Sequence, residues 1–152
     1  MSSAISIRLA RPGDASRLAE LLAGGALTDG QEDPADVAAY ADALADIDAD
    51  PDAEVLVAEL DGAVVAMCQL IMFRQLQRRG GRCAEIESVH VAAEHRGRGI
   101  GGRLLEEAVA RAAARGCYRV QLTSDRSRTD TPRFYERHGF TASHVGFKRW
   151  LD

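Results

Sequence analysis

A glycine-rich stretch in the second half of the chain has the residue types and spacing of an anion-binding turn. The stretch is Glu94-His95-Arg96-Gly97-Arg98-Gly99-Ile100-Gly101-Gly102-Arg103. Glycines have no Cβ, so consecutive backbone N–H groups can converge on one point, and a helix start adds about half a positive charge. Arg96, Arg98 and Arg103 add side-chain charge, which suits a pyrophosphate better than an uncharged ligand. The alternative is a connector with solvated arginines.

Two glutamates precede this turn on one predicted strand. Glu85 and Glu87 are two residues apart, so they lie on the same face of a regular strand. Mutual repulsion and partial burial would raise the pKa of such a carboxyl group, which suits a general base that deprotonates an amine. Two solvated glutamates on a strand edge are the alternative. Ser88 and His90 are expected on the opposite face of that strand, mainly as packing residues.

Hydrophobic periodicity indicates the elements that position these residues. A helix between two strands requires a crossover connection, so the strands on either side of the helix after the glycine turn should be parallel, in a mixed sheet. The predicted elements are a strand at 5–9, helices at 15–22 and within 28–52, a β-hairpin at 55–73, a strand at 83–91, a helix at 100–115, a strand at 118–122, a short helix at 132–137 and a last strand or hairpin at 140–150.

The glycine turn resembles the Arg/Gln-x-x-Gly-x-Gly/Ala signature of the GNAT superfamily of acetyl-CoA-dependent N-acetyltransferases, with Arg96-Gly97-Arg98-Gly99-Ile100-Gly101 in the matching place between strand and helix. The resemblance implies that backbone amides around Arg98, Gly99 and Gly101 hold the CoA pyrophosphate. It also implies that Val89 and Val91 pair through their backbone with the pantetheine arm. The residues assigned to the cofactor site are Val89, His90, Val91, Arg96, Gly97, Arg98, Gly99, Ile100, Gly101, Gly102, Arg103 and Thr129.

A second motif, Phe134-Tyr135-Glu136-Arg137-His138-Gly139-Phe140, is similar to the Phe-Tyr-x-x-x-Gly-Phe motif of the same family. Tyr135 stands where the family has its general acid, which protonates the departing CoA thiolate. Glu85 stands where several members carry their catalytic glutamate, while Glu87 could act through a water or contact the amine. Thr129 occupies the place of a frequent pantetheine-contacting Asn. The stretch 127–148 also resembles aminoalkylphosphonate N-acetyltransferases.

The family resemblance implies an α/β (α+β) fold, a mixed, mostly antiparallel central sheet of about six to seven strands flanked by about four helices. It implies a single N-acetyltransferase domain, residues 1–152, that moves an acetyl group from acetyl-CoA directly to an amine in a ternary complex. We expect a small primary amine as acceptor. The acidic stretch 29–52 favours a cationic amine, and the arginines at 74–82 favour an acceptor with phosphate, phosphonate or carboxylate.

Other classes of protein fit the same residues and stay as alternatives. A CoA-binding sensor or partner-binding domain would keep the glycine turn without turnover, and a protein acetyltransferase would act on a lysine or an N-terminus. Gly97, Gly99 and Gly102 also match G-x-G-x-x-G, the dinucleotide fingerprint. A β-hairpin precedes this match and only 50 residues follow Gly102, which disfavours a dinucleotide-binding fold.

The amino-acid composition limits the classes of partner and the cellular location that we expect for this protein. Residues 1–76 carry 4 Arg and 14 acids, a net charge of −10, and residues 77–152 carry 15 basic residues and 9 acids, a net charge of +6. The mildly acidic whole disfavours nucleic acid, while the basic half suits an anionic small molecule. Three cysteines without metal-ligand spacing indicate no metal and no disulfide framework. Without a signal peptide or membrane segment we expect a cytoplasmic protein; a homodimer is one option that stays open.

Overall fold

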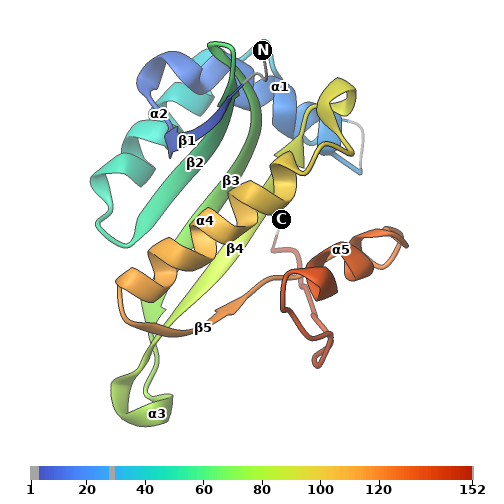
Figure 1. The fold of residues 1–152 in the computed structure, drawn as a ribbon. Coiled ribbons are helices and arrows are strands. Elements are labelled where there is room, and N and C mark those ends of the chain that lie inside the picture. The colour runs from blue at the N-terminus through green and yellow to red at the C-terminus, as the bar shows by residue number, and fades with distance from the viewer. Residues whose placement is uncertain (1–3, 28–29, 152) are drawn as a thin grey trace.

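One mixed β-sheet forms the centre of the protein in the computed structural model, which describes residues 4–27 and 30–151. The strand order is β1-β2-β3-β4-β5, and only the last pair, β4 and β5, is parallel. The elements are β1 (Ile5–Leu9), α1 (Ala15–Gly25), α2 (Val37–Ala49), β2 (Ala53–Leu60), β3 (Ala63–Arg74), α3 (Gln77–Gly80), β4 (Arg82–Val91), α4 (Ile100–Ala114), β5 (Cys117–Gln121) and α5 (Thr131–Arg137), with short 3₁₀ turns at Pro12–Asp14 and Ala93–His95 (Figure 1).

The prediction of six to seven strands is wrong, because the sheet of the described residues has five strands. The missing strand or hairpin was expected at 140–150, where the structure has no strand or helix. Strand-forming residues such as Val145 and Phe147 are present there, but they remain exposed instead of packing on the sheet. A strand forms only where a partner strand completes its backbone hydrogen bonds, and this stretch finds none within the described chain.

The central hairpin has the predicted turn. Asp61 and Gly62 have φ angles of 50° and 82°, the left-handed pair that a two-residue turn needs to match the twist of the strands. The turn sets the register of β2 against β3, with Leu56 opposite Cys68 and Val57 opposite Met67. Their alternating side chains therefore serve two different faces of the sheet.

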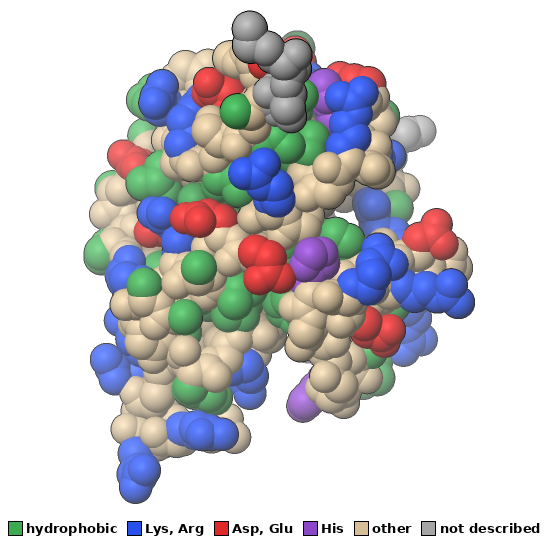
Figure 2. Space-filling model, viewed as in Figure 1, with side chains coloured by type: hydrophobic (Ala, Val, Ile, Leu, Met, Phe, Trp, Pro, Cys, Tyr) green, Lys and Arg blue, Asp and Glu red, His purple; other side chains and the backbone are tan. Residues whose placement is uncertain are grey.

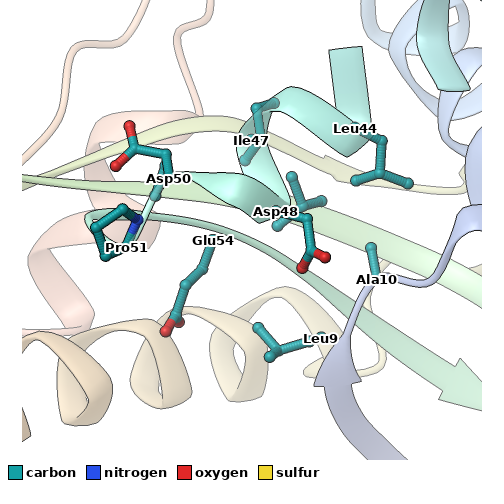
Figure 3. Close-up of a pocket in the computed structure, with 10 residues that line it drawn as sticks. Leu9, Ala10, Leu44, Ile47, Asp48, Asp50, Pro51 and Glu54 are labelled. Atoms are coloured by element: carbon teal, nitrogen blue, oxygen red, sulfur yellow. The ribbon is translucent and has the colours of Figure 1, made fainter. Parts of the chain in front are cut away.

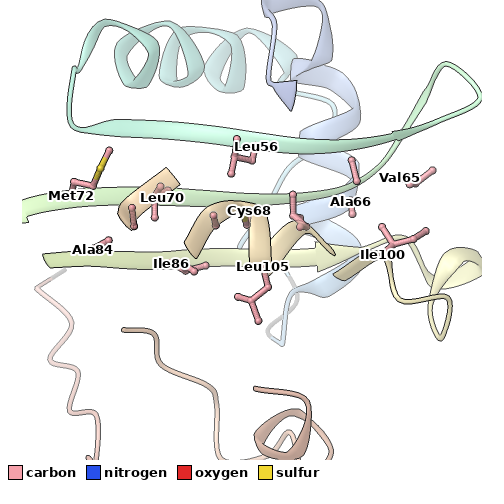
Figure 4. Close-up of a cluster of buried hydrophobic side chains, with 14 residues drawn as sticks. Leu56, Val65, Ala66, Cys68, Leu70, Met72, Ala84, Ile86, Ile100 and Leu105 are labelled. Carbon is pink, nitrogen blue, oxygen red and sulfur yellow. The ribbon is translucent and has the colours of Figure 1, made fainter. Parts of the chain in front are cut away.

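Two apolar clusters cover the two faces. On one face, α4 packs Ile100, Leu104 and Leu105 onto the sheet, where Leu56 and Leu70 are fully buried (Figure 4). On the other, α1 and α2 pack Leu18, Leu21 and Leu44 against the sheet, with the cluster completed by Val55, Val57, Val64, Met67 and Ala92. Each buried Leu or Ile contributes roughly 1.5–3 kcal/mol, which fixes α4 and the turn before it on β4.

The acidic helix lies within the stretch predicted for it. It was expected within 28–52 and spans Val37–Ala49, with an Asp36 carboxylate oxygen that accepts a hydrogen bond from the N–H of Ala39 at 3.2 Å as an N-cap. Thr28 and Asp29 lie outside the described residues. Only Leu44 of this helix is buried, so its aspartates form a solvent-facing surface.

Candidate active site

The glycine turn leaves a run of backbone N–H groups without backbone partners. Gly97 and Gly99 have φ angles of 74° and 76°, the left-handed conformation that a side chain would strain, and Gly99 leads directly into α4. The Arg96 N–H bonds Ala93 O and the Arg103 N–H bonds Gly99 O. Among the described residues, no backbone carbonyl accepts from the N–H groups of residues 97–102. Unpaired N–H groups at a helix N-terminus are of the kind that bind anions, so we refer to residues 97–102 as the predicted anion cradle.

Gly101 and Gly102 are needed for a different reason, close packing. A Cβ on Gly101 would lie 3.3 Å from Val91 Cγ2 and 3.5 Å from the ring of Phe134, and one on Gly102 would lie 2.7 Å from the His138 ring. The start of α4 therefore touches both the end of β4 and α5. His138 Nδ1 also lies 2.9 Å from a carboxylate oxygen of Glu106. The glycine turn and the Phe-Tyr motif, which contains the predicted general acid, therefore pack against each other.

The two parallel strands separate beside this cradle. β4 pairs with β5 only from Arg82 to Glu85, so the edge of β4 from Ile86 to Val91 has no strand next to it in the described chain. A β-bulge lies within that free edge: Ser88 and Val89 both face Cys68 of β3, and Ser88 has a φ of 53°. Val89 and Val91, predicted to pair with pantetheine, have the open backbone edge that such a ligand requires.

The bulge corrects one expectation. Ser88 and His90 were predicted to share the face opposite Glu85, which holds only for a regular strand. Glu87 is paired with Gln69 and His90 with Met67, two β3 residues on the face covered by α1 and α2. His90 therefore lies on the same face as Glu85 and Glu87, with its ring packed against Gly25 of α1. Burial, then the nearby Arg128 charge, lower the pKa of His90.

The two glutamates differ in their surroundings. An oxygen of Glu85 accepts a hydrogen bond from Gln121 Nε2 of β5 at 2.6 Å, at the last pair of residues before the strands separate. Glu87 lies two residues further along β4, where β5 no longer pairs with the strand, and its side chain is exposed. Partial loss of water, followed by the charge of Glu85, raises the pKa of Glu87, and the ammonium of Lys148 opposes this. Glu87 has the environment that favours a general base.

Tyr135 lies on the other face of the sheet. It is half-buried against the cluster under α4, and its ring meets Phe134 and Phe140 edge to face at centroid distances of 5.1 and 5.9 Å. Burial is the main cause that raises the pKa of its hydroxyl, with Arg128 opposing and Cys68 adding to the shift. The phenol keeps its proton across the neutral range. Glu87 and Tyr135 thus lie on opposite faces of the sheet.

Several residues that were predicted to bind the cofactor also make contacts within the fold. Arg96 Nε donates to the Val91 carbonyl at 3.1 Å, and Arg103 Nη2 donates to the Ile5 carbonyl of β1, which turns the Arg103 guanidinium towards the sheet. Ile100 is a buried core residue, so only its backbone can serve a ligand. Arg98 and Thr129 are exposed. The contacts of these residues with a cofactor stay predictions; Arg96 and Arg103 keep their positive charge beside the turn while they donate to backbone carbonyls.

Sequence reasoning missed three residues at this site. Arg128 Nη2 donates to the Gly25 carbonyl at 2.6 Å, which links the loop after β5 to α1 beside His90. Gln121 holds Glu85, and Lys148 of the C-terminal stretch lies near enough to Glu87 to shift its pKa. The predicted parallel pairing of the two strands could have indicated Gln121, because this pairing places Gln121 next to Glu85. Arg128 and Lys148 both lie in the stretch 127–148 that resembles aminoalkylphosphonate N-acetyltransferases, but no local pattern gave either residue a role.

Two surface hollows differ in their relation to the site. One of about 200 Å³ lies between α2 and β2, lined by Leu44, Ile47 and Glu54, away from the turn (Figure 3). The other, of about 190 Å³, lies between α1 and the end of β4, lined by Leu21, Val91 and Arg96 among others, and adjoins the turn. Within residues 4–27 and 30–151 no cluster of His, Cys, Asp and Glu could hold a metal ion. No helix in that part of the chain could cross a membrane.

A known protein family matches the part of the chain that contains the glycine turn, the separated strands and the Phe-Tyr motif. Residues 19–140, from α1 to the end of the Phe-Tyr motif, match the model of the acetyltransferase (GNAT) family. The chain belongs to the GNAT family. The glycine turn, the separated parallel strands and Tyr135 all lie within the matched residues.

Relatives of this GNAT chain include two enzymes that are named after a phosphate or a phosphonate compound. Glucosamine 6-phosphate N-acetyltransferase 1 of Oryza sativa subsp. japonica is 38% identical over 93 residues, 60% of this chain and 54% of that protein. Aminoalkylphosphonate N-acetyltransferase of Salmonella typhimurium is 33% identical over 116 residues, 76% of this chain and 75% of that protein. The match thus spans about half the length of the rice relative, and the likeness to the phosphonate enzyme extends beyond the C-terminal stretch.

A solved structure is similar over almost the whole chain. The crystal structure of a transcriptional regulator from Bacillus halodurans C-125 superposes with a TM-score of 0.93 at 36% identity, covering 97% of this chain and 100% of that one. The fold is therefore shared from end to end.

Proposed function

We propose that this GNAT chain is a single acetyltransferase domain, residues 1–152, that transfers the acetyl group of acetyl-CoA to the primary amine of a small molecule. The observation that carries the proposal is the continuity between two features. Six backbone N–H groups of residues 97–102 lack backbone partners, and they lie directly after the free edge of β4 at Val89 and Val91. A ligand with a pyrophosphate and an extended amide-containing arm fits both at once.

Acetyl-CoA fits this pair of features group by group. The pyrophosphate would accept hydrogen bonds from the amides of the glycine turn, where the start of α4 favours negative charge. The amides of the pantetheine arm would pair with the backbone of Val89 and Val91 as a strand does. Arg98 and Thr129 are exposed beside this path and available for phosphate and amide contacts. Arg103 contributes less, because its guanidinium bonds the Ile5 carbonyl.

In the proposed reaction, the general base and the general acid lie on opposite faces of the sheet. The acceptor amine enters on the face of Glu87 and His90, and Glu87 takes the proton that the amine must lose to attack the thioester carbonyl. A nitrogen–carbon bond forms, the carbon–sulfur bond breaks, and the phenol of Tyr135 on the opposite face gives its proton to the departing thiolate. No acetyl-enzyme is needed. Glu85, held by Gln121, keeps a negative charge beside Glu87 that supports its raised pKa.

The acceptor in this proposal carries a phosphate or phosphonate as well as the amine. Both named relatives act on such a compound by their names, glucosamine 6-phosphate and an aminoalkylphosphonate. In this chain, two cations accompany the acceptor face: Arg128 beside His90 and Lys148 beside Glu87. An anion held there would place an amine a few bonds away near the Glu87 carboxylate.

A matched panel of amines tests the proposal by following release of the CoA thiol. Glucosamine 6-phosphate is compared with glucosamine, and 2-aminoethylphosphonate with propylamine; a lysine peptide and a peptide with a free N-terminus complete the panel. We expect kcat/KM to be about 10-fold to 100-fold higher for the anionic member of a pair, since one charged hydrogen-bonded contact contributes about 1.5–3 kcal/mol. Equal rates within both pairs would contradict the anionic acceptor, and faster peptides would assign the domain to protein acetylation.

A second function is favoured by the name of one similar structure, the transcriptional regulator of Bacillus halodurans. In that case the domain binds acetyl-CoA as a signal and transfers nothing. Calorimetry with acetyl-CoA separates the two functions when it is run beside the thiol assay. Binding without release for any amine supports the sensor and overturns the enzyme.

A further inference from the structure

The bulge in β4 brings His90 onto the acceptor face of the sheet, next to the proposed base. Glu87 is paired with Gln69 of β3 and His90 with Met67, so the two side chains start roughly 6.6 Å apart on one face, the length of two strand residues. The extra residue at Ser88 is the cause, because a residue three positions further along a regular strand would face the other way. A group that can gain and lose a proton therefore lies one side-chain position beyond Glu87.

The imidazole of His90 is half-buried, and its ring nitrogens have no hydrogen-bond partner within the described residues. The ring-nitrogen hydrogen bonds that this part of the chain makes belong to His138 and His144. Nδ1 of His90 faces α1 so closely that a Cβ on Gly25 would lie 2.0 Å from it. Because Nδ1 is turned to α1, Nε2 is the nitrogen that can bond a ligand.

Positive charge surrounds this ring. Arg128, in the loop after β5, donates to the Gly25 carbonyl at 2.6 Å, so its guanidinium is held at the same end of α1 that His90 contacts. Burial lowers the pKa of His90 most, Arg128 lowers it further and Arg96 of the glycine turn adds to this, while Glu32 between α1 and α2 opposes them. The ring is therefore neutral at pH 7, beside a fixed cation.

A dianion placed between His90 and Arg128 would reverse this balance. It would offset the positive field of the guanidinium, and it would accept a hydrogen bond from the protonated Nε2–H. Both effects favour the imidazolium. Since linkage is reciprocal, an anion that favours the proton is itself bound more tightly by the protonated ring.

We propose that His90 and Arg128 form the subsite for the phosphate or phosphonate group of the acceptor, and that His90 takes up a proton from solvent as this anion binds. The inference rests on the proposed function for the compound that carries the anion. Because Glu87 lies one side-chain position along the same face, the subsite favours acceptors whose amine and anion are a few bonds apart. An uncharged amine leaves His90 neutral, so His90 is a specificity-determining residue. The proton returns to solvent when the product leaves.

NMR titration of the histidines tests the subsite, with sulfate as the probe and CoA present to occupy the glycine turn. Sulfate is a tetrahedral dianion whose charge is constant across the neutral range, so a proton taken up must go to the protein. We expect saturating sulfate to raise the pKa of His90 by at least about one unit, which equals a tenfold tighter hold of the protonated ring on the anion. His138, which bonds Glu106 beside α4, is the internal control. A His90 pKa that sulfate leaves in place overturns the proposal.

Two neighbouring glycines provide a matched pair of variants. Gly25→Ala drives a methyl group into the His90 ring, whereas a Cβ on Gly24 meets no atom within 4 Å. We expect Gly25→Ala to lose most of the sulfate response and Gly24→Ala to keep it; equal responses would contradict the subsite. Arg128→Gln is the second variant if Gly25→Ala fails to fold by circular dichroism. It should raise the pKa of His90 without sulfate and reduce the shift that sulfate causes.

The kinetic readout is the preference for 2-aminoethylphosphonate over propylamine. His90→Gln is expected to lower this ratio of kcat/KM values about tenfold, mainly through the KM for the phosphonate, and a ratio equal to that of the wild type would exclude His90 from specificity. An enzyme that acetylates the phosphonate while His90 ignores sulfate overturns this inference alone. A His90 that responds to sulfate in a chain that acetylates no amine supports the anion subsite and overturns the proposed function.

Discussion

At the scale of single residues, the difference between Glu85 and Glu87 is one of hydrogen bonding and position. Gln121 donates to Glu85 where the strands still pair, whereas Glu87 lies beyond the last pair and is exposed. The sequence could place both carboxylates on one face but could not rank them. The choice depends on Gln121 and Lys148, which lie far away in the chain and reach the site only through the fold.

Glu87→Gln is expected to lower kcat at neutral pH about 100-fold or more, the usual contribution of a general base. Only the unprotonated carboxylate accepts the amine proton, so wild-type activity falls as the pH drops through the raised pKa of Glu87. The variant should lose this acidic limb from its pH–rate profile. Glu85→Gln, the matched control, keeps the limb and moves it to lower pH, because it removes a negative charge from beside Glu87. A limb that survives in Glu87→Gln would assign the proton to another group.

Tyr135→Phe removes the proposed acid while keeping the ring that packs against Phe134 and Phe140. We expect kcat to fall about 10-fold to 100-fold with little change in the dissociation constant of acetyl-CoA. Burial raises the pKa of this hydroxyl, so the wild-type profile should show no basic limb from Tyr135 below about pH 10. Unchanged turnover of the variant with normal acetyl-CoA affinity would exclude Tyr135 as the acid.

At the scale of elements, the sequence predicted most of the scaffold and missed two features of strands. The β2–β3 hairpin, the helix after the glycine turn and the parallel pairing of β4 with β5 are confirmed, because period-two and helical patterns and a turn pair are local signals. The bulge at Ser88 was missed, since it depends on how β3 is paired and not on residue type. The last strand, predicted at 140–150, is wrong, because its strand-forming residues find no partner strand among the described residues.

Gly99→Ala tests the glycine turn as an element. The φ of 76° would cost an L-residue roughly 1–2 kcal/mol, and relaxation of the turn would move amides out of the cradle. We expect the dissociation constant of acetyl-CoA to rise about tenfold, measured by calorimetry. Gly13→Ala is the control, because a Cβ at Gly13 meets no atom within 4 Å and its φ is not left-handed. Equal affinity in both variants would contradict an anion cradle at the turn.

At the scale of the whole molecule, ion pairs between the two halves of the chain neutralise part of their opposite charges. Arginines of the basic half pair with acids of the acidic half: Arg82 and Arg115 with Asp52, and Arg111 with Glu54 at 2.6 Å. These pairs join α4 and β4 to the start of β2. Charge of one sign also gathers on two surfaces: aspartates on the solvent face of α2, and arginines around α3 at the tip of the molecule (Figure 2).

Asp14 is expected to control part of the stability of the molecule at low pH. Arg8 and the N–H of Arg11 bond its carboxylate at 2.7 Å each, which ties β1 to the start of α1 and lowers the pKa of Asp14, Arg8 being the main cause. The stabilisation is therefore complete above the ordinary pKa of about 3.9 and is lost as the pH falls through the lowered value.

Asp14→Asn should lower the free energy of unfolding at pH 7 by about 1–3 kcal/mol, and the difference from wild type should shrink below pH 4. Urea denaturation at several pH values measures it. Asp46→Asn, on the exposed face of α2, is the control and should change little. A constant difference across the acid range would show that Asp14 acts through packing alone.

The bulge at Ser88 has a consequence for insertions and deletions in β4. In a regular strand, loss of one residue turns every later side chain to the wrong face. Here the extra residue is already present, so deletion of Ser88 would leave Val89 opposite Cys68 and His90 opposite Met67 in plain alternation. His90 would stay on the face of α1, and Val89 and Val91 on the face of α4. This position of β4 can therefore lose one residue without turning the end of the strand over, whereas an insertion or deletion elsewhere in the strand would turn it.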